Sequence, residues 1–135
     1  HVGQAGPFTE ASGHVRALDW LPGSPAACFF KHAHNAFSDT GLDLWLRRRG
    51  IDHLIVAGIR TEQCCETTTR VGCDIGYAID FVSEATLTFP MTHPATGRIY
   101  STEEIKAHSE LVLAGRFARI VSVDGCLAGL GDDNA

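Results

Sequence analysis

The sequence predicts an α/β fold in three layers, with helices on both faces of a mainly parallel sheet. Short apolar runs of about four to six residues alternate along the chain with helix-like segments of about ten to fourteen residues. Each strand–helix–strand unit makes a right-handed crossover, so consecutive strands run parallel. With 135 residues, of which 44% are hydrophobic and 20% charged, the chain fits one domain with an ordinary core.

The pattern divides this single domain, residues 1–135, into three parts. Residues 1–25 are rich in Gly, Pro and Ser, and they predict a long loop with one turn near residues 15–21. Residues 26–123 carry the α/β core, and residues 124–135 predict a tail. Because the chain opens without a methionine, in sequence typical of the middle of a domain, we expect the natural protein to begin earlier.

Four apolar runs predict the strands. The run Ala26–Phe30 is continuous, as in a strand buried on both faces, and it ends at Lys31. His53–Gly58 predicts the second strand, Tyr77–Val82 the third and Arg119–Val123 the fourth. In open parallel sheets, ligands bind beyond the carboxyl ends of such strands.

Three helices connect these strands. Thr40 can cap the first helix, which is about ten residues long. Glu62–Ile75 predicts the second helix. Ser101 or Thr102 caps the third, and Glu104 lies three residues after Ser101, the spacing of a capping box.

The composition excludes several classes of protein. Every apolar stretch is far shorter than the roughly 20 residues that cross a bilayer. A net charge of −5, with 11 scattered basic residues, indicates no nucleic-acid surface. Five cysteines, an odd number without a C-x-x-C pair, argue against a disulfide framework and against a zinc site. A reducing cytoplasm fits this cysteine usage.

The segment Gly58–Cys64 runs from the end of a strand into the first turn of a helix, and it carries the candidate nucleophile. At a helix N-terminus, unpaired amides and the dipole favour the thiolate of Cys64, and the same amides can hold an oxyanion. Glu62 opposes this effect, so an additional cation is useful. Lys31 can supply it, because the carboxyl ends of parallel strands meet at one edge of the sheet.

The other cysteines are predicted to be structural. Cys65 points about 100° away from Cys64 around the helix, which favours packing. Small buried side chains that fill the core are the commonest role of cysteine in such domains. We assign that role to three more cysteines: Cys28, Cys73 and Cys126.

Two histidines and a phenylalanine near Lys31 have open roles. His32 and His34 share a strand face and suggest a metal, but two ligands without a third are a weak signal, so solvated or pocket-lining side chains are expected. Phe37 fits either the core or the apolar wall of a substrate pocket, and it is kept as a pocket candidate together with His34.

Four segments of the chain combine into a recognisable pattern: Lys31–Leu46, Gly50–Ile51, Ile55–Cys65 and Gly76–Tyr77. They follow K…(S/N)-A-F…T…L…L…G-(I/V) combined with G-V-x-T-(D/E/N)-x-C-V…T. Over about residues 26–123 the chain therefore resembles the isochorismatase-like cysteine hydrolases, a Rossmann-like superfamily that includes nicotinamidases, N-carbamoylsarcosine and ureidoacrylate amidohydrolases, and isochorismatase.

The resemblance implies roles for individual residues. Lys31 becomes the lysine of a catalytic triad and Cys64 its nucleophile. A cis peptide between Ile59 and Arg60 would aim the Arg60 and Cys64 amides at the substrate oxygen. The third member of the family's triad is an aspartate on a central strand, and no such strand precedes His1, so we expect the strand and its aspartate to be missing from this chain.

The resulting hypothesis is a cysteine hydrolase that cleaves a small amide or carbamoyl C–N bond through a Cys64 thioester. Isochorismatase-type ether hydrolysis, a redox-sensing protein and a catalytically incomplete relative remain alternatives. We expect no metal and no cofactor, a small-molecule substrate, no nucleic-acid or membrane partner, and a homodimer or homotetramer. Residues 1–25 and 86–100 are expected to supply pocket walls.

Overall fold

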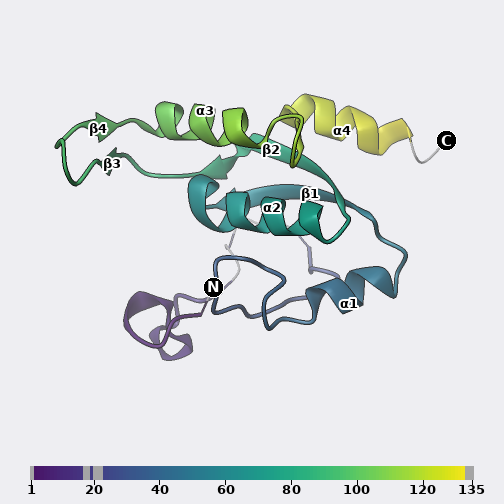
Figure 1. The fold of residues 1–135 in the computed structure, drawn as a ribbon. Helices are drawn as coiled ribbons and strands as arrows, with labels where there is room; N and C mark the ends of the chain where they lie inside the picture. Colours follow the sequence, from purple (N-terminus) through teal and green to yellow (C-terminus); the bar gives the residue numbers. More distant parts are fainter. Residues whose placement is uncertain (1, 17–18, 20–22, 133–135) are drawn as a thin grey trace.

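The computed structural model describes residues 2–16, 19 and 23–132 and shows a parallel sheet flanked by helices (Figure 1). Its elements are, in chain order, the 3-10 turns η1 (Gly6–Phe8) and η2 (Glu10–Ser12), α1 (Leu42–Arg47), β1 (His53–Ile59), the π-helical turn η3 (Thr61–Cys65), α2 (Glu66–Asp74), β2 (Ala78–Leu87), β3 (Met91–Thr92), β4 (Ile99–Tyr100), α3 (Thr102–Leu113), β5 (Arg119–Ile120) and α4 (Val123–Asp132).

The parallel sheet has three strands in the order β1-β2-β5. β1 and β2 run side by side from His53, opposite Ala78, to Ile59, opposite Leu87. Strands β3 and β4 form a separate antiparallel hairpin that projects from the body (Figure 1). The predicted α/β class with a mainly parallel sheet is confirmed.

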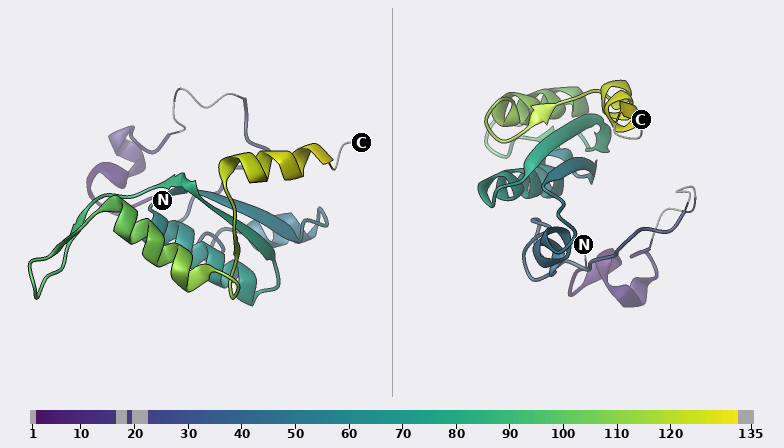
Figure 2. Two further views of the ribbon diagram at one scale, coloured as in Figure 1. Left: turned by 90° about the horizontal axis from the view of Figure 1, so that it is seen from above. Right: turned by 90° about the vertical axis from the view of Figure 1, so that its right-hand side faces the viewer.

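Helices cover both faces of this sheet (Figure 2, left). Helix α2 packs so closely on β2 that a Cβ atom added to Gly72 would lie 2.7 Å from Cδ1 of Ile79. Helix α4 lies on the opposite side from α2 and α3, and its first amide, at Val123, donates to Glu84 of β2 over 2.8 Å. The core between sheet and helices contains Leu46, Cys65, Tyr77, Ile79, Phe81, Leu113 and Ala118.

Two helix ends show how local sequence defines the elements. Ser101 is the N-cap of α3, and its side chain and that of Glu104 bond reciprocally to each other's backbone amides, so the predicted capping box is confirmed. Helix α1 is shorter than expected. It ends at Arg47 because the amides of Arg49 and Gly50 turn back to carbonyls three residues earlier and tighten the last turn.

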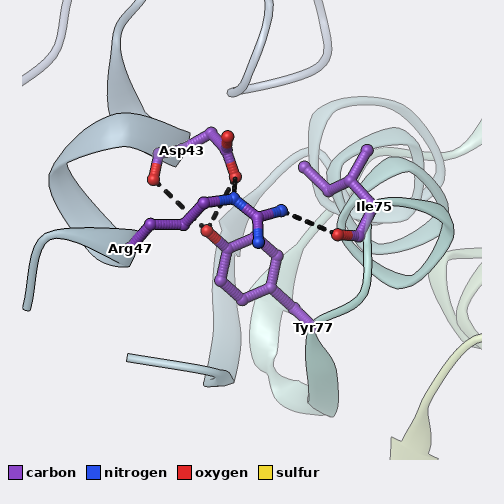
Figure 3. Close-up of polar contacts among 4 residues, drawn as sticks. All are labelled: Asp43, Arg47, Ile75 and Tyr77. Atoms are coloured by element: carbon purple, nitrogen blue, oxygen red, sulfur yellow. Dashed lines mark hydrogen bonds and ion pairs between the residues drawn. The ribbon is translucent and has the colours of Figure 1, made fainter. Parts of the chain in front are cut away.

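A polar cluster fixes α1 to the sheet (Figure 3). The Tyr77 hydroxyl donates to a carboxylate oxygen of Asp43 over 2.8 Å, and the guanidinium of Arg47 donates to Asp43 and to the Ile75 carbonyl, also over 2.8 Å each. The hydrogen bond from Arg47 lowers the pKa of Asp43 below its usual value. These contacts join α1 to the residues that lead into β2.

Two predictions about strands are wrong. Ala26–Phe30 forms no strand, because no described strand lies beside it, and the backbone bond nearby joins Val2 N–H to the Lys31 carbonyl over 2.7 Å. The fourth strand ends at Ile120, and Val123 begins α4, so the expected tail is helical up to Asp132. Much of the turn predicted for residues 15–21 lies outside the described residues. None of the helices in the described ranges combines the length and hydropathy needed to cross a bilayer.

Candidate active site

The turn that follows β1 presents Cys64. The peptide bond between Ile59 and Arg60 is cis, as the resemblance implies. Directly after it, the chain enters η3, in which the amides of Gln63 and Cys65 donate to the Arg60 carbonyl over 3.2 and 3.1 Å. Cys64 therefore lies on a strand-to-helix elbow, in the first turn of the helical segment.

Residues at and just after the end of β2 form hydrogen bonds with this elbow. The hydroxyls of Thr61 and Thr86 lie 2.7 Å apart, and both residues are completely buried. The Thr88 hydroxyl donates to Glu62 over 2.6 Å. Because a buried hydroxyl without a partner is costly, the pair of threonines ties the position of the elbow to the sheet.

The ammonium of Lys31 lies beside the sulfur of Cys64. The distance from Lys31 Nζ to Cys64 Sγ is 3.3 Å, and Nζ also donates to the carbonyls of Ala33 and His34 over 2.8 Å each. An ammonium has three N–H donors, so all three are engaged and the charge is fixed in position. A fixed cation next to sulfur favours the thiolate, the nucleophilic form of cysteine.

The neighbouring Cys65 has the opposite environment. It is 4% exposed, and burial raises the pKa of its thiol to about 11. Cys65 therefore stays protonated at neutral pH, whereas Cys64 is only partly buried and opens onto a cavity. Cys64 is therefore the candidate reactive thiol, and Cys65 packs in the core.

A cavity of about 530 Å³, here named the Cys64 cavity, lies in front of the thiol. Its walls include five residues singled out from the sequence: Lys31, His34, Ile59, Arg60 and Cys64. The other described residues that line it are His14, Val15, Arg16, Gln63 and Phe89. A cavity of this size accommodates a small molecule.

The additional wall residues come from segments that the sequence indicated only as ranges. Residues 14–16 belong to the loop-rich start, and Phe89 follows β2. Their proximity to Cys64 depends on how these two segments, which are distant in the sequence, fold over the elbow. No local sequence pattern predicts that arrangement. The sequence indicates a role for the backbone amide of Arg60. It does not predict that the side chain of Arg60 lies beside the ring of Phe89.

Phe37 does not line the cavity, so its assignment as a pocket candidate is corrected to the core. Its ring stacks on that of Tyr77, with centroids 5.6 Å apart, and lies over Gly72 of α2. Because Gly72 has no side chain, it leaves room for the Phe37 ring to pack against the core. His32 also lies outside the cavity lining, with Nδ1 2.9 Å from the Val2 carbonyl oxygen.

No carboxylate is among the residues lining the Cys64 cavity in the described part of the chain. The adjacent Glu62 has one carboxylate oxygen 3.1 Å from Nε of Arg60. Within the described ranges, no three His, Cys, Asp or Glu side chains group as metal ligands. The expected absence of metal and cofactor stays a prediction.

A larger and more open cavity of about 740 Å³, here named the Asp80 cavity, is lined by residues at the opposite, amino ends of the strands. Arg119 donates to both carboxylate oxygens of Asp80 over 2.7 Å, and Nε2 of His53 lies 3.1 Å from one of them. The hydrogen bonds from Arg119 lower the pKa of Asp80 below its usual value. These groups satisfy one another, so catalytic chemistry is better supported at the Cys64 cavity.

Comparison with known proteins identifies a family. The model of the isochorismatase domain matches residues 3–115. The isochorismatase family protein YwoC of Bacillus subtilis is 37% identical over 83 residues, which are 55% of this chain and 44% of YwoC. Nicotinamidase 3 of Arabidopsis thaliana is 33% identical over 94 residues, which are 70% of this chain and 41% of that protein. The chain thus spans less than half the length of these two relatives.

A solved structure shows the same fold. A member of the isochorismatase family from Chromobacterium violaceum superposes with a TM-score of 0.88 at 29% identity. The match covers 98% of this chain and 69% of the other. The fold described above is therefore shared with that protein over nearly all of the present chain.

Proposed function

The chain belongs to the isochorismatase family, and on that premise we propose that it is a cysteine hydrolase that cleaves the C–N bond of a small amide or carbamoyl compound. One observation carries the proposal: the Lys31 ammonium lies 3.3 Å from the Cys64 sulfur in the wall of a cavity. Similarity to a protein named as a nicotinamidase supports an amide as the substrate.

The first step forms a thioester. The Cys64 thiolate attacks the carbonyl carbon, the C=O electrons move to oxygen, and the backbone amides of Arg60 and Cys64 stabilise the oxyanion. When the carbonyl re-forms, the C–N bond breaks, and the nitrogen takes up a proton to leave as ammonia or an amine. Lys31 holds the thiolate during the attack and balances its charge.

The second step hydrolyses the thioester. Water adds to the carbonyl carbon, the C–S bond breaks, and a carboxylic acid leaves while the Cys64 thiolate is regenerated. Both steps require an acid–base group that moves a proton between substrate and solvent. The resemblance assigns that task to an aspartate on a central strand, and the described cavity-lining residues include no carboxylate.

The test is turnover of a panel of small carboxamides and N-carbamoyl compounds. We expect Cys64→Ala to lower kcat/KM by at least about a thousandfold, because the nucleophile is removed. Cys65→Ala is the matched control, since its buried thiol is outside the cavity lining, and it should stay within a few-fold of wild type. Mass spectrometry of the quenched wild-type enzyme should show an acyl adduct on Cys64. Amide turnover that survives in Cys64→Ala would overturn the covalent mechanism.

A further inference from the structure

The hydroxyl of Thr68, on α2, accepts a hydrogen bond from the Ala36 amide over 3.0 Å, and this contact has no part in the proposed reaction. We infer that Thr68 is a positioning residue: through residues 33–36 it holds the Lys31 ammonium beside the Cys64 sulfur. Its effect on turnover rests on the proposed function, whereas its effect on the reactivity of the thiol does not.

Residues 33–36 form the bend that holds the ammonium. Lys31 Nζ donates to the carbonyls of Ala33 and His34 over 2.8 Å each and lies 3.3 Å from Cys64 Sγ. A lysine ammonium is a compact charge at the end of a flexible stem, so its position depends on the groups to which it donates. The position of the two carbonyls therefore determines how close the charge lies to the sulfur.

The backbone of Ala36, at the end of this bend, is held by two threonine hydroxyls. Its amide donates to Thr68 Oγ1 over 3.0 Å, and its carbonyl accepts from Thr40 Oγ1 over 2.6 Å. The Thr40 hydroxyl also accepts from the Leu42 amide over 3.2 Å, at the start of α1. Because these side chains come from separate parts of the fold, the bend cannot move relative to either part without breaking a hydrogen bond.

Thr68 belongs to the helical segment that presents the nucleophile. It lies in α2, which follows η3 directly, and it comes four residues after Cys64. Side chains four residues apart in a helix lie on about the same face. The hydrogen bond from Ala36 to Thr68 therefore links the segment that carries the sulfur to the bend that holds the ammonium.

The adjacent Thr67 provides a matched contrast. Its side chain has the same chemistry, lies on the same helix and is also partly buried, but no described residue forms a hydrogen bond with its hydroxyl. A change of Thr67 to valine therefore has the same effect on helix propensity as the same change at Thr68, without the loss of a partner for the bend.

The test measures the alkylation of Cys64 by iodoacetamide as a function of pH in four proteins: wild type, Thr68→Val, Thr68→Ser and Thr67→Val. Valine has the shape of threonine but cannot accept from the Ala36 amide. Thr68→Val should slow alkylation about threefold or more at pH 7 and move the midpoint of the pH–rate profile upward, because a displaced ammonium stabilises the thiolate less. Thr68→Ser, which restores the acceptor, and Thr67→Val should stay within about twofold of wild type.

Two outcomes of this comparison overturn the inference. One is an alkylation profile of Thr68→Val that matches that of wild type. The other is a slower rate with an unchanged midpoint, because a change in packing alone would alter access to the thiol without altering its ionisation.

A second measurement asks whether Thr68 acts through Lys31. In a Lys31→Met background the charge is absent, so adding Thr68→Val should change the alkylation rate by less than about twofold. A loss as large as in the wild-type background overturns the positioning role.

Hydrolysis of the amide panel then connects this role to turnover. Thr68→Val should lower kcat with little change in KM, because Thr68 is not among the described residues that line the Cys64 cavity. If no amide is hydrolysed while the alkylation rates follow the expected pattern, the proposed function fails and the positioning role of Thr68 stands. If amides are hydrolysed and kcat is unchanged in Thr68→Val, the positioning role fails and the proposed function stands.

Discussion

The Cys64 cavity and the Asp80 cavity lie at opposite ends of the same sheet. They differ in whether their polar groups already have partners within the protein. In the Asp80 cavity, both oxygens of Asp80 accept from Arg119, and His53 lies against one of them. In the Cys64 cavity, the Lys31 ammonium lies 3.3 Å from an accessible sulfur, and no carboxylate is among the described lining residues.

This difference teaches that cavity volume alone does not identify a functional site. The Asp80 cavity is the larger, at about 740 Å³ against about 530 Å³. Its charges, however, neutralise one another across neighbouring strands and stabilise the sheet. In the Cys64 cavity, the ammonium of Lys31 lies beside an accessible thiol, which is the arrangement that the proposed hydrolysis uses.

The largest expected effect concerns the cation beside the thiol. Lys31→Met keeps most of the side-chain volume but removes the charge, so the thiolate of Cys64 loses its stabilising partner. We expect alkylation of Cys64 by iodoacetamide at pH 7 to slow by about tenfold or more, as followed by mass spectrometry of the modified peptide. Cys65, whose thiol has a pKa of about 11, serves as an internal control and should react slowly in both proteins. An unchanged rate at Cys64 would mean that Lys31 does not activate the thiol.

Much of the α/β core could be predicted because its signals are local. The run beginning at His53 is apolar enough to define β1, and the capping box at Ser101 defines the start of α3. The run Ala26–Phe30 has the same apolar character, yet it forms no strand, because a strand also needs a neighbour to accept its backbone hydrogen bonds. Pairing of this kind is a property of the whole fold.

The site was predictable where backbone topology determines it. Lys31 and Cys64 were expected together because both follow apolar runs, and the structure brings them into contact even though the first run is not a strand. The sequence leaves Phe37 open between the core and the pocket wall, because nothing in its neighbourhood indicates the space above Gly72, where the ring packs. The side chains of Arg60 and Phe89 come together through tertiary packing, so no sequence motif predicts their contact.

An intermediate effect on stability is expected at the other end of the sheet. Asp80→Asn keeps the shape of a buried side chain but weakens both hydrogen bonds with Arg119, and it should lower the free energy of unfolding by about 1 to 2 kcal/mol at pH 7. Urea denaturation measures this difference. Asp74→Asn, which changes an exposed carboxylate on α2, is the control. Alkylation of Cys64 should be unaffected in both variants, and a slower rate in Asp80→Asn would mean that the two cavities are coupled.

The pH dependence of that difference follows from the lowered pKa of Asp80. Because the folded protein binds this proton less readily than the unfolded chain, the carboxylate contributes its full stability above the unfolded value of about 3.9. The contribution is lost as the pH falls from there through the folded pKa. Wild type and Asp80→Asn should therefore converge in stability below about pH 4.

The smallest effect is expected at His53, the half-exposed partner of Asp80. Its imidazole Nε2 lies 3.1 Å from one carboxylate oxygen, but 49% of the His53 side chain is accessible to water, which competes for the same contact. Since Arg119 satisfies both oxygens on its own, His53→Gln should lower the free energy of unfolding by no more than about 0.5 kcal/mol at pH 7, measured as for Asp80→Asn. A loss as large as that of Asp80→Asn would show that His53, rather than Arg119, holds the carboxylate. The Asp80 carboxylate would then be held by a group that is charged only when it is protonated, and the contrast between the two cavities would depend on the protonation of His53.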